Sequence, residues 1–170
     1  MTTLGSLTDP RGTAGVHIGT LEFNPFVSDN ILSEAQVVEI RFDAIRSVLG
    51  VVLELRVSLY DWDACAGLLM AEGVDGYSWS QTDRGDIETA WTIFSSRPRA
   101  VGEQVALHVS GEPSFTLGFT ARRSTFFTGR IERLEGTAPP DYREIVASAS
   151  HHDIPNWESL VTDIKAVHHP

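Results

Sequence analysis

The sequence predicts a mainly β fold, an antiparallel sheet of about seven or eight short strands with little helix. Three observations predict it. Apolar and polar residues alternate with period two in several stretches, as they do in half-buried strands. Those stretches are rich in β-branched and aromatic residues, and short segments of turn chemistry separate them. The alternative is an α+β fold in which residues 141–149 and 156–166 form helices packed on one face of the sheet.

A chain of 170 residues is expected to form one domain, and its composition divides it into three parts. Residues 1–20 are rich in Gly and Thr and are expected to form a flexible N-terminal arm. Residues 21–134 hold the alternating pattern and are expected to form the antiparallel β domain. Residues 135–170, in which Pro139 and Pro140 interrupt regular structure, are expected to be a tail packed on that domain.

Bulky side chains near both ends of the chain are expected to fasten it to the domain. Phe23 and Phe26 flank Pro25, which argues for an edge strand or a staple and against a central strand. Trp157 and Leu160 are expected to anchor the tail.

Residues 37–43 and 51–60 carry the clearest alternation. An antiparallel pairing that places Ile40 opposite Leu55 brings apolar residues together on one face, with Val57 and Leu59 continuing the apolar row. It also brings together two pairs of opposite charges: Glu39 with Arg56, and Arg41 with Glu54. Each such pair contributes about 0.2–1 kcal/mol. A slip of the register by one residue would expose the apolar row of one strand to solvent. We interpret the charges as a device that sets the register of a hairpin.

Further stretches with strand composition follow along the chain: 68–73, 76–81, 87–96, 104–109, 114–121 and 124–134. Turn chemistry is expected at 61–67, 81–86 and 110–113, and a loop at 96–103. If 76–81 and 87–94 form a hairpin, the rings of Tyr77, Trp79 and Trp91 lie close together. An exposed aromatic row would mark a binding surface, whereas a buried one would be core.

The charge balance bears on the kind of partner. The net charge is −10 and the pI is about 4.9, which disfavours nucleic acid and suits a basic protein partner. Residues 97–133 differ from the rest, because six arginines against three glutamates give this stretch a net charge of +3.

An enzyme or small-molecule-binding protein is the alternative function, with a pocket between the sheet and the C-terminal tail. Its polar groups would be drawn from five residues: Asp61, Asp63, His108, Arg122 and Arg123. Paired carboxylates such as those of the sequence DWD can do acid–base work or bind a divalent cation. The chain contains no nucleophile elbow, phosphate-binding loop, dinucleotide fingerprint or C-x-x-C pair.

No cofactor and no metal site are expected. Four of the six histidines form the adjacent pairs 151–152 and 168–169, and adjacent side chains point apart. Cys65 is the single cysteine, so no intrachain disulfide forms, and a cytoplasmic location is expected. No apolar run approaches the roughly 20 residues of a membrane span, and the N-terminus lacks the pattern of a signal peptide.

Four segments together resemble a group of small uncharacterised bacterial proteins akin to immunity-type proteins that neutralise a toxin: 37–59, 90–96, 138–145 and 154–159. The resemblance covers about two thirds of the chain. It implies a binding protein without chemistry and carries over no functional residue.

The sequence therefore predicts a small acidic β protein that binds another protein, with an inhibitory, immunity-like role as one version. The candidate contact surface consists of the charged hairpin and the aromatic row: Glu39, Arg41, Glu54, Arg56, Tyr77, Trp79 and Trp91. Pairing of exposed sheet edges into a homo-oligomer stays open.

Overall fold

A computed structural model describes residues 1–9, 11–82, 90–140 and 153–169. These residues form one sheet of eight strands and no α-helix, which confirms the mainly β prediction. The strands are β1 (Gly19–Thr20), β2 (Gln36–Asp43), β3 (Val48–Glu54), β4 (Ala66–Gln81), β5 (Trp91–Val101), β6 (Gln104–Glu112), β7 (Phe115–Arg130) and β8 (Thr162–His169). Two short 3₁₀ turns complete the described elements: η1 (Gly5–Thr8) and η2 (Glu132–Leu134).

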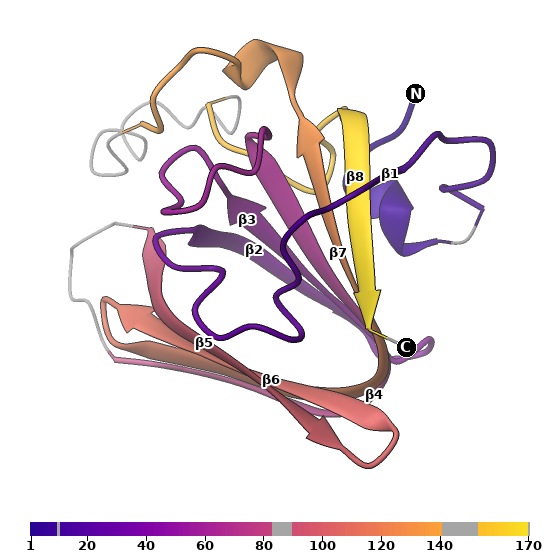
Figure 1. Cartoon of the computed structure of the whole chain (residues 1–170), viewed down its shortest axis with the longest axis vertical. Helices are drawn as coiled ribbons and strands as arrows, with labels where there is room; N and C mark the ends of the chain where they lie inside the picture. Colours follow the sequence, from indigo (N-terminus) through magenta and orange to yellow (C-terminus); the bar gives the residue numbers. More distant parts are fainter. Residues whose placement is uncertain (10, 83–89, 141–152, 170) are drawn as a thin grey trace.

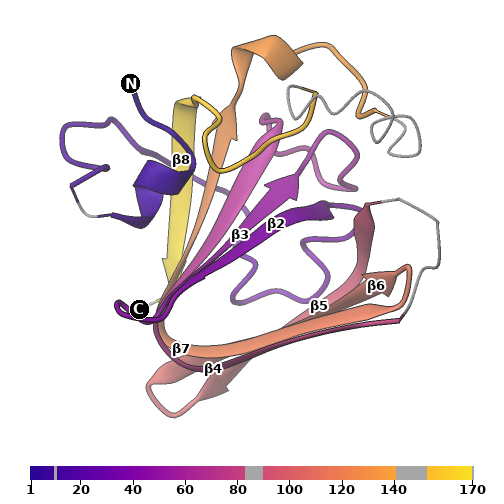
Figure 2. The same cartoon turned by 180° about the vertical axis from the view of Figure 1, so that it is seen from behind.

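The sheet is folded over on itself, because β4 and β7 are long and bent. Its strand order is β1-β8-β7-β4-β3-β2-β5-β6, and β6 also pairs with β7. All pairings are antiparallel except that of β1 with β8. Figures 1 and 2 show two arms that meet where β4 and β7 turn. The upper arm contains β2, β3, β8 and one half of β4 and β7, and the lower arm contains β5, β6 and the other halves.

Two hydrophobic clusters lie on opposite faces of the upper arm. The first fills the space between the arms and includes Leu53, Ile93, Leu107, Leu117 and Phe126, all at most 1% exposed. The second covers the outside of β3, β4, β7 and β8. A strand between two covered faces must be apolar on both, and every residue of β3 is buried accordingly.

The predicted antiparallel pairing of the first two strands is confirmed, but its register is wrong. Ile40 pairs with Val51 instead of Leu55, and a bulge follows Val37. The second strand, β3, ends at Glu54, so Val57 and Leu59 of the predicted apolar row lie beyond it and are exposed. The predicted cross-strand charge pairs do not form. Each acidic residue instead bonds an arginine two residues along its own segment: Glu39 with Arg41, and Glu54 with Arg56.

Several predicted strand boundaries are also corrected. The predicted strands 68–73 and 76–81 are one strand, β4, and 114–121 continues past residue 124 in β7. Residues 97–101, expected in a loop, extend β5. The expected hairpin of 76–81 with 87–94 is wrong, because residues 76–81 pair with β7, and residues 83–89 lie outside the described structure. A bulge after Val74 lets β4 pass from one arm to the other without ending.

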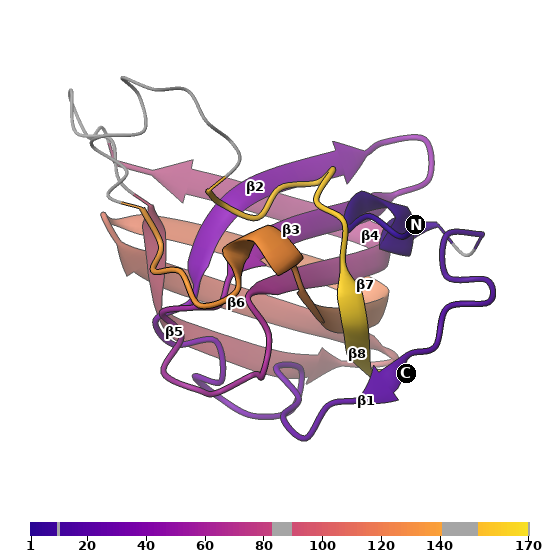
Figure 3. The same cartoon turned by 90° about the horizontal axis from the view of Figure 1, so that it is seen from above.

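The N-terminal residues pack against the tail, which differs from the flexible arm that the composition predicts. Leu4 and Leu7 are buried in the second cluster, and Thr3 forms a β-bridge with Leu160. Figure 3 places both chain termini at the same end of the molecule, beside β1 and β8. These two leucines are the apolar anchors that a reading based on Gly and Thr content overlooks.

The predicted anchors have mixed outcomes. Phe26 is buried, Phe23 packs its ring at 5.4 Å from that of Tyr60, and β1 is a short edge strand. Trp157 packs against the second cluster, but Leu160 is exposed, so its predicted anchoring role is wrong. The alternative helix at 156–166 is also wrong, since a turn leads into strand β8; the alternative helix at 141–149 lies outside the described residues.

Trp157 occupies a slot that two glycines leave open. A Cβ atom added at Gly50 would lie 2.5 Å from the indole ring, and one at Gly5 would meet the same ring. We expect Gly50→Ala to displace the ring and lower the free energy of unfolding by about 1–3 kcal/mol, the usual cost of overpacking. Urea unfolding measures this. Gly76→Ala is the matched control, because nothing lies within 4 Å of its added Cβ; equal losses in the two variants would contradict the slot.

Candidate functional site

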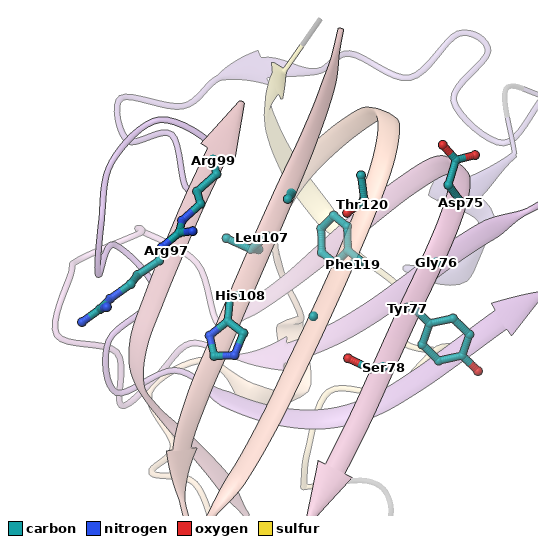
Figure 4. A pocket seen from close by; sticks show the side chains of 12 residues that line it. Asp75, Gly76, Tyr77, Ser78, Arg97, Arg99, Leu107, His108, Phe119 and Thr120 are labelled. Carbon is teal, nitrogen blue, oxygen red and sulfur yellow. The ribbon is translucent and has the colours of Figure 1, made fainter. Parts of the chain in front are cut away.

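A shallow groove of about 920 Å³ lies on the outer face of the lower arm. Four strands form its floor in the order β4-β7-β6-β5. One row of residues in register across them is Ser78, Gly118, His108 and Arg97, and the next is Gly76, Thr120, Ala106 and Arg99. Figure 4 shows both arginines on one side of the groove and Asp75 with Tyr77 on the other. The surface is concave here because most of the outward-facing side chains that the two central strands, β6 and β7, place in it are small.

The positive side chains of the groove have no described ion-pair partner, whereas the negative one has a hydrogen-bond partner. Arg97 and Arg99 are exposed and form no ion pair with any described residue, and neither does His108. On the opposite side, the Asp75 carboxylate accepts a hydrogen bond from the Gln104 side chain. The arginine side of the groove therefore has a positive charge that nothing described neutralises.

A second feature is an open edge of the folded sheet. Beyond the bend, residues 75–81 of β4 pair with β7 on one side and with no described strand on the other. Residues 38–43 of β2 likewise pair only with β3. Phe42 and Tyr77 extend from these two edges, 37% and 43% exposed, and their tilted rings are in contact, with centroids 4.7 Å apart. The molecule thus has two strand edges with half-exposed aromatic rings between them.

The predicted aromatic row is divided between this edge and the core. Tyr77 is at the edge, whereas Trp79 packs its ring at 5.5 Å from Trp91 and 5.2 Å from Phe115. Trp91 is buried and belongs to the first cluster, and Trp79 is half-buried. The two tryptophans come together as expected, through pairing of β5 with β2 and not through the predicted hairpin. Phe42 is not among the predicted contact residues, because it lies two residues after Ile40 and alternation places both on the apolar face of the strand.

The charged hairpin residues hold the tail. The Glu39 carboxylate accepts a hydrogen bond of 2.9 Å from the Trp157 backbone N–H, and the Arg41 guanidinium lies 5.0 Å above the indole ring. Glu54 and Arg56 are deeper: their side chains are 0% and 9% exposed, and Arg56 Nη2 donates to Glu54 Oε2 at 2.6 Å. These four side chains are all engaged in contacts within the chain.

The residues of the alternative enzyme site do not come together. Asp61 and Asp63 line a separate cavity of about 520 Å³ near the β3–β4 connection, and His108 lines the groove. Arg123 lies at a third cavity, where it pairs with Glu72 at 3.6 Å. Arg122 lines none of these three cavities.

The two carboxylates of the DWD sequence, those of Asp61 and Asp63, make different interactions. Asp61 Oδ1 accepts a hydrogen bond of 2.9 Å from the backbone N–H of Asp63, as in an Asx turn. The Arg130 guanidinium and then the Lys165 ammonium hold the pKa of the Asp63 carboxyl below its ordinary value. Because that pKa is lowered on folding, these contacts stabilise the fold above the ordinary pKa and are lost as the pH falls through the lowered one.

Cys65 and the described histidines lie in separate local environments. Burial raises the pKa of the Cys65 thiol, whose Sγ accepts a hydrogen bond of 3.0 Å from Ile131 N–H. His168 Nδ1 lies 2.9 Å from Thr125 Oγ1. Within the described residues no three side chains form a metal-binding group, and no helix is long and apolar enough to cross a bilayer. His151 and His152 lie outside these residues.

Fold and surfaces together define a small mainly β protein with a groove on one face and an open sheet edge. Its role is unassigned. No protein-family model and no curated protein matches the chain. Among solved structures it is similar to an uncharacterized protein from Neisseria gonorrhoeae, with a TM-score of 0.44 and 10% sequence identity over 58% of this chain and 94% of that chain. This match gives no role, and the likeness to immunity-type proteins stays a hypothesis.

Proposed function

We propose that this protein acts by binding another protein, through an extended segment of the partner that adds as a strand to the open edge. The observation that supports it most is the run of residues 75–81, which pairs with β7 on one side and with no other described strand. Unpaired N–H and C=O groups on a strand edge are a template for an added strand, and alternate side chains of the guest would meet the flanking surface.

Aromatic side chains at this edge supply the apolar contact. A guest strand beside β4 would lie next to Tyr77 and Phe42, whose rings are half-exposed. Aromatic residues are over-represented among the residues that dominate binding energy. Behind them the buried Trp91 and the half-buried Trp79 pack together against the first cluster, and a well-packed edge lowers the entropy cost of binding.

The charge of the chain suggests the chemistry of the partner. A net charge of −10 attracts a basic protein and speeds the encounter, so the guest segment is expected to carry Lys or Arg. Inhibition of a basic protein, as an immunity-type protein would do, is the finer form of this proposal. The proposal takes the cytoplasm as the site of action and needs neither nucleic acid nor a membrane.

The test uses short random peptides displayed on phage and selected on the whole chain. We expect the enriched peptides to be basic, with apolar residues at alternate positions, and to slow hydrogen exchange at the backbone amides of residues 75–81. Tyr77→Glu should weaken their binding at least about tenfold, which corresponds to about 1.4 kcal/mol. Leu59→Glu is the matched control, since Leu59 is an exposed apolar residue away from the edge and should leave binding unchanged.

Three outcomes would contradict the proposal. Enriched peptides could leave the amides of residues 75–81 unprotected, or Tyr77→Glu could bind them as tightly as the parent chain. A selection that yields no binding peptide would also count against it. If sedimentation shows a dimer that protects the same amides, the edge is occupied by a second copy of this chain and the proposal of a different partner is wrong.

A further inference from the structure

The groove on the outer face of the lower arm supports an inference that is independent of the open edge. It lies across β4, β7, β6 and β5, on the face opposite the buried row Val105, Leu107 and Val109. Arg97 and Arg99 stand on the same face of β5, two residues apart. Side chains two residues apart on a strand are separated by about 7 Å, which is also the repeat of alternate side chains in any extended peptide.

These arginines differ from most other described arginines of the chain. Five other described arginines form ion pairs with carboxylates: Arg41, Arg46, Arg56, Arg123 and Arg130. Arg97 and Arg99 have no such partner, although the chain has ten more acidic than basic residues. An arginine fork that faces solvent without a partner is well suited to bind a carboxylate in a bidentate way.

The floor of the groove beside the two arginines is formed by residues with small side chains. Gly118 and Ala106 lie between the arginine side and the β4 side, with Ser78 and Thr120 as the neighbouring polar groups. Small residues at such positions let another backbone approach closely, and the hydroxyls can donate hydrogen bonds to it. His108, next to Arg97 in register, adds a ring N–H on the same side.

We propose that this groove binds an extended acidic peptide segment of a partner protein. Alternate Asp or Glu side chains of the segment bond to Arg97 and Arg99, and its backbone lies over Gly118 and Ala106. The carboxylate of Asp75 on the far side repels acidic groups there, so the segment lies nearer to β5 and β6 than to β4.

Single-stranded nucleic acid is the other polyanion with a comparable repeat, and two observations disfavour it. Proteins that bind single strands stack bases on exposed aromatic side chains, whereas the aromatic residues that line this groove are the buried Phe119 and, on the β4 side away from the arginines, Tyr77. The net charge of −10 also repels a long phosphate backbone more strongly than a short segment with a few carboxylates.

The test measures fluorescence anisotropy of a labelled peptide of alternating Glu and Ser, with the whole chain at low ionic strength. A peptide of alternating Gln and Ser and an oligodeoxythymidine are the comparison probes. We expect the Glu peptide to bind, with an affinity that falls as salt is raised, and the Gln peptide to bind at least tenfold more weakly. The double variant R97A/R99A should weaken binding of the Glu peptide at least tenfold.

Two further variants separate the groove from general charge. Arg11→Ala removes a positive charge from the exposed N-terminal segment and should change the affinity less than twofold. Ala106→Leu fills the floor without a change of charge and should weaken binding while circular dichroism stays that of the parent chain. Absence of binding at low salt, equal effects of Arg11→Ala and R97A/R99A, or tighter binding of the oligodeoxythymidine than of the Glu peptide would each overturn the inference.

Discussion

Glu54→Gln is expected to lower the free energy of unfolding by about 3–5 kcal/mol, the usual cost of removing one partner from a buried ion pair. Glu54 is fully buried and receives three hydrogen bonds from Arg56: 3.0 Å from its backbone N–H, 2.9 Å from Nε and 2.6 Å from Nη2. The amide keeps the volume of the carboxylate but removes the charge that compensates the guanidinium, whose side chain is only 9% exposed. Urea unfolding followed by circular dichroism measures the change.

The loss should spread beyond the pair, because Arg56 also organises two distant segments. Its Nη1 donates to Thr137 Oγ1 at 2.7 Å, and its Nη2 donates to the Asp153 carbonyl at 2.8 Å. Hydrogen exchange near residues 137–138 and 153 should therefore quicken in Glu54→Gln under conditions where the β4–β7 strands stay protected.

Glu39→Gln is the matched control for this prediction. Glu39 also bonds an arginine two residues away, but the side chains of Glu39 and Arg41 are 26% and 49% exposed. Exposed pairs contribute about 0–1 kcal/mol, so the control should lose little. A second control, E54L/R56M, removes both charges and should recover most of the stability lost in Glu54→Gln. Similar losses in Glu54→Gln and Glu39→Gln would contradict the assignment of a buried pair.

Phe126→Ala is expected to cost about 3–5 kcal/mol, because truncation of a fully buried phenylalanine leaves a cavity as well as a loss of apolar contact. Phe126 is 0% exposed on β7, and its ring lies 5.1 Å from that of Trp62, edge to face. It also lies against Gly67, where an added Cβ would be 2.9 Å from the ring. The ring thus connects β7, β4 and the β3–β4 connection.

Phe94→Ala provides the comparison, since Phe94 is 53% exposed on β5 and its truncation should change the free energy of unfolding by less than about 0.5 kcal/mol. Thermal and urea unfolding of both variants measure the difference. A loss in Phe126→Ala no larger than that in Phe94→Ala would show that the ring is not part of the packed core.

Local alternation predicted the faces of individual strands well. Val105, Leu107 and Val109 are buried as a row, and so are Phe115, Leu117, Phe119 and Ala121. This succeeds because successive side chains of a strand point to opposite faces, and one face of these strands is solvated. The seven residues of the predicted contact surface have different surroundings in the structure. Among them, Tyr77 alone is an exposed aromatic at the open edge, while the four charged residues bond one another and the tail.

The amino-acid sequence by itself determined that this chain forms short alternating strands, which of their faces are apolar, and that turns and not helices connect most of them. Only the tertiary structure decided which strand pairs with which, where β4 and β7 bend, and which charges are buried. The physical reason is the distance along the chain between the residues that determine each feature. Side-chain alternation is a property of neighbouring residues, whereas register, bulges and the pairing of Glu54 with Arg56 depend on what covers each strand from far along the chain.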